Sequence, residues 1–212
     1  MAKKTNISEH PFDSRAKRFY TQHHLNMHLH AISEFEIYSR AKSIDIISEC
    51  TEQDIKRLKQ TCFSHYRRVN SLELKGPHDG LTTTDLSQII TRAWGLSGRD
   101  KAERKETNED APFLSKETIQ EMADYPSRRT ITIVSVTRPD KILNTPEIIQ
   151  EYGFHPTLRE GVYKSSKIAI PMWIIHPDEL ALIPRNYPLL PLSRGKKLQQ
   201  FVELCVEKKM DY

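Results

Sequence analysis

The chain has 212 residues, 37% of them apolar, which is enough for one sizeable core and predicts a single domain over residues 12–212 after a flexible leader, residues 1–11. The 32 lysines and arginines outnumber the 28 aspartates and glutamates by four, so the net charge permits a nucleic-acid partner without requiring one. No apolar run approaches the length of a membrane span and the first residues lack a signal region, so we expect a cytoplasmic protein without membrane contact.

The first part of the chain changes from a helical to an extended pattern. Apolar and aromatic residues recur at helical spacing over residues 13–30, which predicts a helix. Residues 34–38 alternate between polar and apolar, and residues 42–47 are rich in isoleucine, so two strands joined near Arg40 are expected. A capping-box pattern over residues 51–54 predicts a short helix before the next strand.

Residues 69–75 predict a third strand, which ends at the turn-forming residues 76–80. Thr82 and a carboxylate three residues later form a second capping box, and an apolar stripe from there to Leu96 predicts the clearest helix of the chain. The opposite, polar stripe of this helix consists of Thr84, Gln88, Thr91 and Arg92.

The second half of the chain mixes short strands with turns. Residues 97–127 are charged and poorly periodic, except for a short helix expected over residues 115–122. Residues 129–136 predict a buried strand, and residues 195–209 predict a closing amphipathic helix. Further strands are expected at residues 161–163, 168–170, 172–175 and 180–183.

The third strand carries a charged motif, Glu73-Leu74-Lys75. Because side chains alternate along a strand, Glu73 and Lys75 point to the same face. Asp45 lies on the preceding strand, and the pairing of the two strands would bring its carboxylate close to that of Glu73. Two carboxylates and an ammonium group around one divalent cation are suited to hydrolysis of a phosphodiester.

A helix, a strand, a strand with Asp45, a strand with Glu-x-Lys and a further helix follow one another in this order. The order and the motif resemble the PD-(D/E)XK nuclease superfamily, although Ile44 stands where the name-giving proline would be. The stretch from Glu36 to Thr82 is similar to predicted bacterial nucleases related to transposase-like, recombination-promoting nucleases. The resemblance implies an α/β fold with a restriction-endonuclease-like mixed β-sheet core flanked by helices.

The resemblance also implies the catalytic residues. Asp45 matches the first acid of the motif, Glu73 the second acid and Lys75 the lysine. Asp45 and Glu73 are therefore the expected ligands of Mg2+ or Mn2+, which prefer oxygen ligands. Lys75 is expected to orient the attacking water or to stabilise the developing charge.

Four further residues have supporting roles in the same interpretation. An acid on the first helix or strand often completes the metal shell in this superfamily, and Glu36 is favoured over Glu34 for that position. Gln88 is expected to contact the metal shell or the scissile phosphate. Arg40 and Arg92 are the expected nucleic-acid contacts.

Three functions are open at this point. The first is a divalent-metal-dependent phosphodiesterase, namely a DNA endonuclease of defence or mobile-element biology. Its substrate is DNA, with RNA as the alternative, and partner proteins would supply the targeting. The second is a catalytically inactive nuclease-fold module that binds nucleic acid or protein. The third is an unrelated α/β binding protein in which Glu73 and Lys75 are surface charges. The oligomeric state is left open.

Other reactive side chains have simpler interpretations. His24 and His28 share the four-residue spacing of a zinc pair, but a polar helix face is the favoured explanation. Trp94 and Trp173 lie on apolar stripes and are expected in the core. Neither a disulfide framework nor a thiolate zinc site fits the three cysteines, which are expected as reduced thiols: Cys50, Cys62 and Cys205.

Overall fold

The computed structural model describes residues 11–36, 43–96 and 114–209. The predicted leader lies outside these ranges except for Pro11, which begins the first helix. The predicted nucleic-acid contact Arg40 also lies outside them. No helix in the described ranges is long and apolar enough to cross a membrane.

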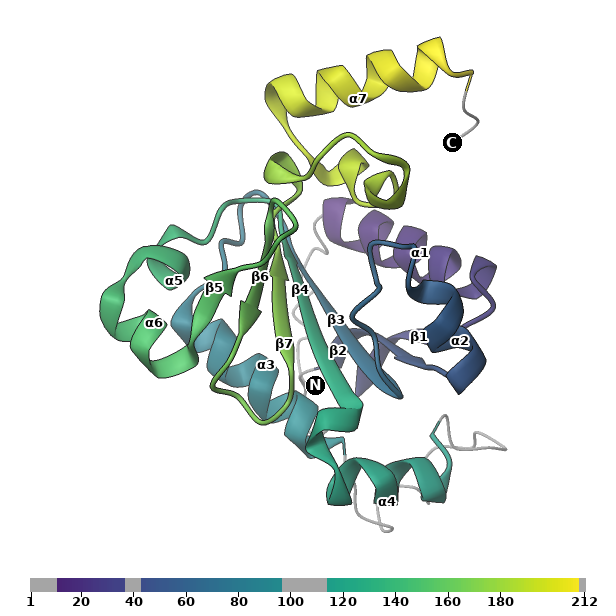
Figure 1. The fold of residues 1–212 in the computed structure, drawn as a ribbon, viewed down its shortest axis with the longest axis vertical. Helices are drawn as coiled ribbons and strands as arrows, with labels where there is room; N and C mark the ends of the chain where they lie inside the picture. Colours follow the sequence, from purple (N-terminus) through teal and green to yellow (C-terminus); the bar gives the residue numbers. More distant parts are fainter. Residues whose placement is uncertain (1–10, 37–42, 97–113, 210–212) are drawn as a thin grey trace, which may run out of the picture.

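A seven-stranded mixed sheet runs through the described residues in the order β1-β2-β3-β4-β7-β6-β5, and helices flank it (Figure 1). The central strands β3, β4 and β7 are parallel, while the other neighbours are antiparallel. β3 and β4 are almost wholly buried, as is usual for parallel strands covered on both faces. The strands are β1 His30–Glu36, β2 Ser43–Glu49, β3 Val69–Lys75, β4 Arg129–Ser135, β5 Phe154–Pro156, β6 Val162–Ser165 and β7 Met172–Ile175.

The helices bury apolar side chains against both faces of the sheet. On one face, Tyr20 of α1 packs in the same core as Ile46 and Leu72. On the other face, Ile89 of α3 packs in a core with Ile133. The α-helices are α1 Pro11–Asn26, α2 Glu52–Leu58, α3 Thr83–Gly95, α4 Lys116–Asp124, α5 Asp140–Asn144, α6 Pro146–Tyr152 and α7 Gly195–Glu207; the 3-10 helices are η2 Pro126–Arg128, η3 Pro177–Glu179, η4 Pro184–Asn186 and η5 Leu190–Leu192.

Local capping fixes the helices on either side of β3. Thr51 and Thr82 cap α2 and α3, and each accepts a hydrogen bond from the backbone of a carboxylate residue that bonds back to the cap. Both predicted capping boxes are confirmed. Because α2 returns the chain to the sheet, β2 and β3 pair directly despite the long insertion between them, with Ile46 opposite Leu72.

The first helix ends earlier than predicted. α1 stops at Asn26, because His28 has a φ of 59°, a left-handed conformation that terminates helices. The chain then enters β1 at His30 rather than at residue 34. His24 and His28 therefore do not share a helix face, so both the zinc pair and the polar face are wrong.

His24 is instead a buried core residue. Its Nδ1 donates to the carbonyl oxygen of Tyr20 at 2.6 Å, and its Nε2 accepts from the hydroxyl of Tyr66 at 3.0 Å. Burial lowers the pKa of His24 to about 4, so the imidazole is neutral at physiological pH.

Two strands predicted in the second half are absent from the described sheet. Residues 168–170 form bends, and residues 180–183 connect the 3-10 helices η3 and η4, whose first residues are Pro177 and Pro184. Proline cannot donate a ladder hydrogen bond and favours such turns. The structure also contains α5, α6 and β5, which the sequence patterns did not predict.

The two tryptophans differ in burial, and the three cysteines are free thiols. Trp173 is buried, as expected, but Trp94 is 41% exposed and lies under the guanidinium group of Arg129 at 4.9 Å. Its prediction as a core residue is wrong, because the buried face of α3 consists of Leu86, Ile89 and Ala93. The three cysteines are free thiols, with Cys50 and Cys62 buried, as predicted.

Candidate active site

The strands β2 and β3 bring Asp45 and Glu73 next to each other. Ile46 and Leu72 are the last paired residues toward this end, so Asp45 and Glu73 come next in the same antiparallel register. The Oδ2 atom of Asp45 accepts a hydrogen bond from the backbone N–H of Leu74 at 2.8 Å. The carboxylate of Asp45 is therefore fixed against β3, where its charge acts on Glu73.

A lysine from α1 reaches the same carboxylate. The Nζ atom of Lys17 lies 3.3 Å from Oδ1 of Asp45, and the two side chains are only 14% and 15% exposed. α1 holds Lys17 in this place because Ala16 and Tyr20, one helical turn apart, are buried in the core below. The sequence analysis missed Lys17. The available signal was its position at the edge of the buried stripe of the helix.

Glu73 is a buried carboxyl group with incomplete hydrogen bonding. Its Oε2 atom accepts from the guanidinium group of Arg92 at 2.9 Å, but its buried Oε1 atom has no hydrogen-bond partner within the described structure. Burial and then the charge of Asp45 raise the pKa of Glu73 to about 8, against the opposing effects of Arg92 and Lys75. A buried carboxyl oxygen without a partner is destabilising, so a further cation or donor at this atom would be stabilising.

Lys75 is held by two carboxylates at the end of β3. Its Nζ atom lies 3.0 Å from Oδ2 of Asp79 in the following turn and 3.0 Å from Oδ1 of Asp85 in the first turn of α3. Burial alone lowers the pKa of Lys75, but the hydrogen bonds to Asp85 and Asp79 outweigh it and raise this pKa above its ordinary value. Lys75 therefore stays a cation at neutral pH.

Helix α3 lines the Glu73 side of the site. Asp85 meets Lys75 and Arg92 meets Glu73, so the helix runs back along β3. Gln88 is partly buried and lies between Asp85 and Arg92 on the same helical face, three residues from one and four from the other. The predicted contact of Gln88 with a metal shell or phosphate stays a prediction. Arg92, a predicted nucleic-acid contact, binds Glu73 in this structure.

The predicted additional metal ligand, Glu36, lies at the end of β1. Its partner in the sheet is Ser43, two residues before Asp45. By the same register, Glu34 comes level with Asp45. Backbone register thus places Glu34, the alternative that the sequence analysis ranked second, closer to Asp45 than Glu36. The metal-ligand role of Glu36, like the alternative role of Glu34, stays a prediction.

The site offers a limited set of metal ligands. No group of three or more His, Cys, Asp or Glu side chains in the described part of the chain is arranged to hold a metal ion. Asp45 and Glu73 nevertheless supply two neighbouring carboxylates, one with an unpartnered oxygen. Mg2+ is commonly bound by one or two carboxylates and completes its shell with waters and substrate phosphate oxygens. The residues present fit such an ion.

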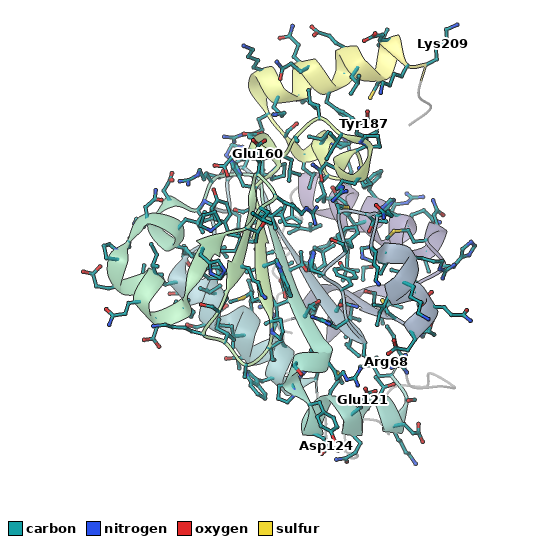
Figure 2. The ribbon with its side chains drawn as sticks, in the orientation of Figure 1. Arg68, Glu121, Asp124, Glu160, Tyr187 and Lys209 are labelled. Atoms are coloured by element: carbon teal, nitrogen blue, oxygen red, sulfur yellow. The ribbon has the colours of Figure 1, made fainter. Side chains whose placement is uncertain are left out.

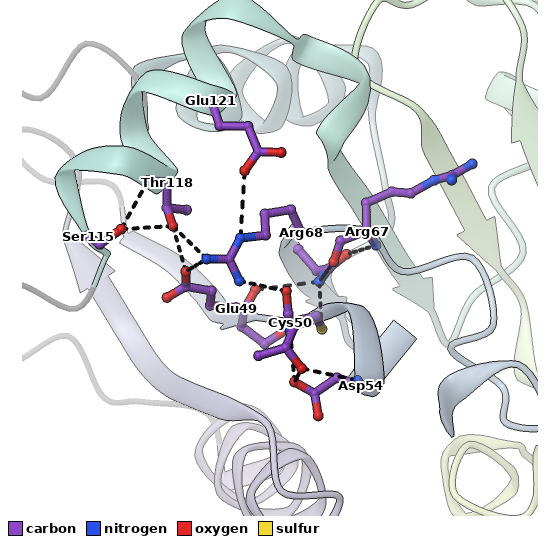
Figure 3. A network of polar contacts seen from close by, with 11 residues as sticks. Glu49, Cys50, Asp54, Arg67, Arg68, Ser115, Thr118 and Glu121 are labelled. Carbon is purple, nitrogen blue, oxygen red and sulfur yellow. Dashed lines mark hydrogen bonds and ion pairs between the residues drawn. The ribbon is translucent and has the colours of Figure 1, made fainter. Parts of the chain in front are cut away.

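A second polar cluster lies at the other end of β3 and has a structural role (Figure 3). Arg68 forms an ion pair with Glu49 at 2.7 Å and donates to the hydroxyl of Thr118 at 3.0 Å and to the carbonyl of Cys50 at 2.8 Å. These contacts fasten α4 to the end of β2. Figure 2 shows Arg68 beside α4, at the end of the molecule away from Tyr187 and α7. Such a closed network of paired groups indicates stability rather than ligand binding.

A scan against protein-family models matched no family, and searches of curated proteins and of solved structures found no match. The geometry around Asp45, Glu73 and Lys75 is thus the basis for assigning a function.

Proposed function

We propose that the protein is a divalent-metal-dependent phosphodiesterase, a DNA endonuclease of the PD-(D/E)XK type with a restriction-endonuclease-like sheet. The observation that carries the proposal is the juxtaposition of Asp45 and Glu73, where the buried Oε1 atom of Glu73 lacks a hydrogen-bond partner among the described residues. A carboxyl group whose pKa is strongly shifted by burial and by a specific charged neighbour is a candidate functional group. The mixed sheet agrees with this type of fold, and β3 and α3 carry Glu73, Lys75 and Gln88 as expected.

Each residue has a defined task in this proposal. Asp45 and Glu73 would hold Mg2+ or Mn2+, an ion that lowers the pKa of a bound water and polarises the scissile phosphate. The Leu74 N–H fixes the orientation of Asp45, and Arg92 fixes that of Glu73. Lys75, positioned by Asp85, would donate a hydrogen bond to the attacking water or to a non-bridging phosphate oxygen.

DNA is the proposed substrate, with RNA as an alternative polymer that offers the same phosphodiester. Partner proteins that supply targeting remain part of the proposal, as do Gln88 beside the site and the predicted contact Arg40. These assignments follow from the nuclease proposal and are tested with it.

The direct test is cleavage of supercoiled plasmid DNA in the presence of Mg2+ or Mn2+. We expect nicking by the wild type and a loss of at least about 100-fold in Asp45→Asn and Lys75→Met, the size usual for removal of one catalytic group. Glu203→Gln on the exposed face of α7 is the control and should cleave normally. Circular dichroism would establish that all variants are folded. Equal cleavage by wild type and both site variants would reject this active site.

The charge pairing of the site favours a second candidate. Asp45, Glu73 and Lys75 each already have a partner of opposite charge in Lys17, Arg92 and Asp85, respectively. A catalytically inactive module that keeps the fold for binding nucleic acid or protein would show the same pairing. Binding of a DNA duplex without any cleavage in either metal would favour this candidate.

A further inference from the structure

The candidate site contains cations that compete with a metal ion. Lys17 lies 3.3 Å from one oxygen of Asp45, while the other oxygen accepts the Leu74 N–H. Arg92 occupies one oxygen of Glu73. A divalent cation that binds Asp45 therefore meets an ammonium group at the same carboxylate, and like charges at this separation repel each other strongly in a partly buried site.

Lys17 is the cation best able to leave. Its helix is anchored, since Ala16 and Tyr20 are buried and the Tyr20 hydroxyl donates to the carbonyl of Pro188 at 2.8 Å. The ammonium group itself ends a flexible four-carbon stem, whereas the planar guanidinium group of Arg92 is held between α3 and β3. The flexible stem lets the ammonium group of Lys17 change position while the anchored backbone of α1 stays in place.

We propose that Lys17 occupies the cation position at Asp45 in the metal-free protein and moves to a substrate phosphate when a divalent ion binds. This inference rests on the proposed function, and it makes Lys17 a substrate-binding residue that couples the metal to the nucleic acid. A phosphodiester gives the displaced ammonium a new anionic partner and adds an oxygen ligand to the metal. The ion and the nucleic acid therefore bind cooperatively, and the coupling is reciprocal.

The coupling is measurable without catalysis. Free Mn2+ would be titrated by electron paramagnetic resonance, with the protein alone and with a DNA duplex that carries phosphorothioates at all linkages to slow its cleavage. For the wild type, we expect weak Mn2+ binding alone and an affinity about tenfold or more higher with the duplex, within the usual range of such couplings.

Lys17→Met removes the charge but keeps an unbranched apolar stem. We expect this variant to bind Mn2+ about tenfold more tightly than the wild type in the absence of DNA and to gain less from the duplex. Lys17→Arg retains the charge and should lie close to the wild type. Arg18→Met is the matched control, because it removes a cation from the neighbouring, exposed position of the same helix. Its Mn2+ affinity should be unchanged.

The outcomes separate this inference from the nuclease proposal. Equal Mn2+ affinity of the wild type and Lys17→Met overturns the role of Lys17, even if the protein cleaves DNA. The same holds if neither protein binds Mn2+, or if Arg18→Met matches Lys17→Met. Tighter Mn2+ binding by Lys17→Met without any cleavage by the wild type supports the exchange at Asp45 and overturns the nuclease proposal alone.

Discussion

Glu73→Gln tests how strongly the folded protein opposes ionisation of a buried carboxyl group. The pKa of Glu73 rises from its ordinary value of 4.5 to about 8, first through burial and then through the charge of Asp45. Between these values the folded protein binds the proton more tightly than the unfolded chain. The resulting stability is fully present below pH 4.5 and is lost as the pH rises through about 8. At about 1.4 kcal/mol per pH unit, the loss is at most about 5 kcal/mol in the free energy of unfolding.

Glutamine has no proton to lose, so the variant should lack this pH dependence. Urea denaturation of both proteins in EDTA, from about pH 4.5 to about pH 8.5, measures the difference between their free energies of unfolding. We expect this difference to move by several kcal/mol in favour of Glu73→Gln as the pH rises. Any repacking cost of the glutamine is independent of pH and does not affect the slope. Glu203→Gln on the exposed face of α7 is the control and should give a flat difference. A flat difference for Glu73→Gln would refute the reasoning.

Three further predictions concern the scaffold. Thr82→Ala removes the cap of α3 and should lower the free energy of unfolding by about 1 kcal/mol in urea denaturation. Gly161→Ala should lower the melting temperature more than Gly195→Ala: both glycines have positive φ, but only the first would place a Cβ 2.7 Å from a backbone carbonyl oxygen. Equal losses would contradict this account. Arg68→Met, which breaks the network in Figure 3, should destabilise by about 2 kcal/mol, whereas Arg128→Met on a 53% exposed side chain should cost less than about 1 kcal/mol in the same assay.

The parts of the fold that the sequence predicted are those with local causes. Thr51 and Thr82 begin helices through hydrogen bonds to residues three positions away, so the capping pattern is readable in the chain. β3 ends at a dense run of turn formers and β4 is rich in β-branched residues, and these patterns gave the bounds of both strands to within a residue. The three-residue strand β5 is different, because its pairing with β6 stabilises it and local composition does not reveal it.

The two acids and Lys75 were predictable from the sequence, but the cations that pair with the two acids were not. The motif pointed to Asp45, Glu73 and Lys75, and the register of β2 and β3 brings the two acids together. Lys17 and Arg92 reach those acids from helices on opposite faces of the sheet, through packing that no short pattern encodes. Which of Glu34 and Glu36 comes level with Asp45 likewise depends on the register of β1 and β2, and a shift of two residues would exchange them.

The composition of the site argues against a purely structural role for Glu73. A buried ion pair such as that of Glu73 and Arg92 is often no more stabilising than apolar residues of the same volume. Here the cost is higher, since a second carboxylate, Asp45, lies beside the first and one oxygen of Glu73 lacks a hydrogen-bond partner in the described structure. An aliphatic side chain like those of its neighbours Leu72 and Leu74 would fill this buried position without the cost of burying a carboxyl group. The buried oxygen of Glu73 and the adjacent charge of Asp45 are therefore a costly arrangement that packing alone does not explain, which makes Glu73 a candidate functional group.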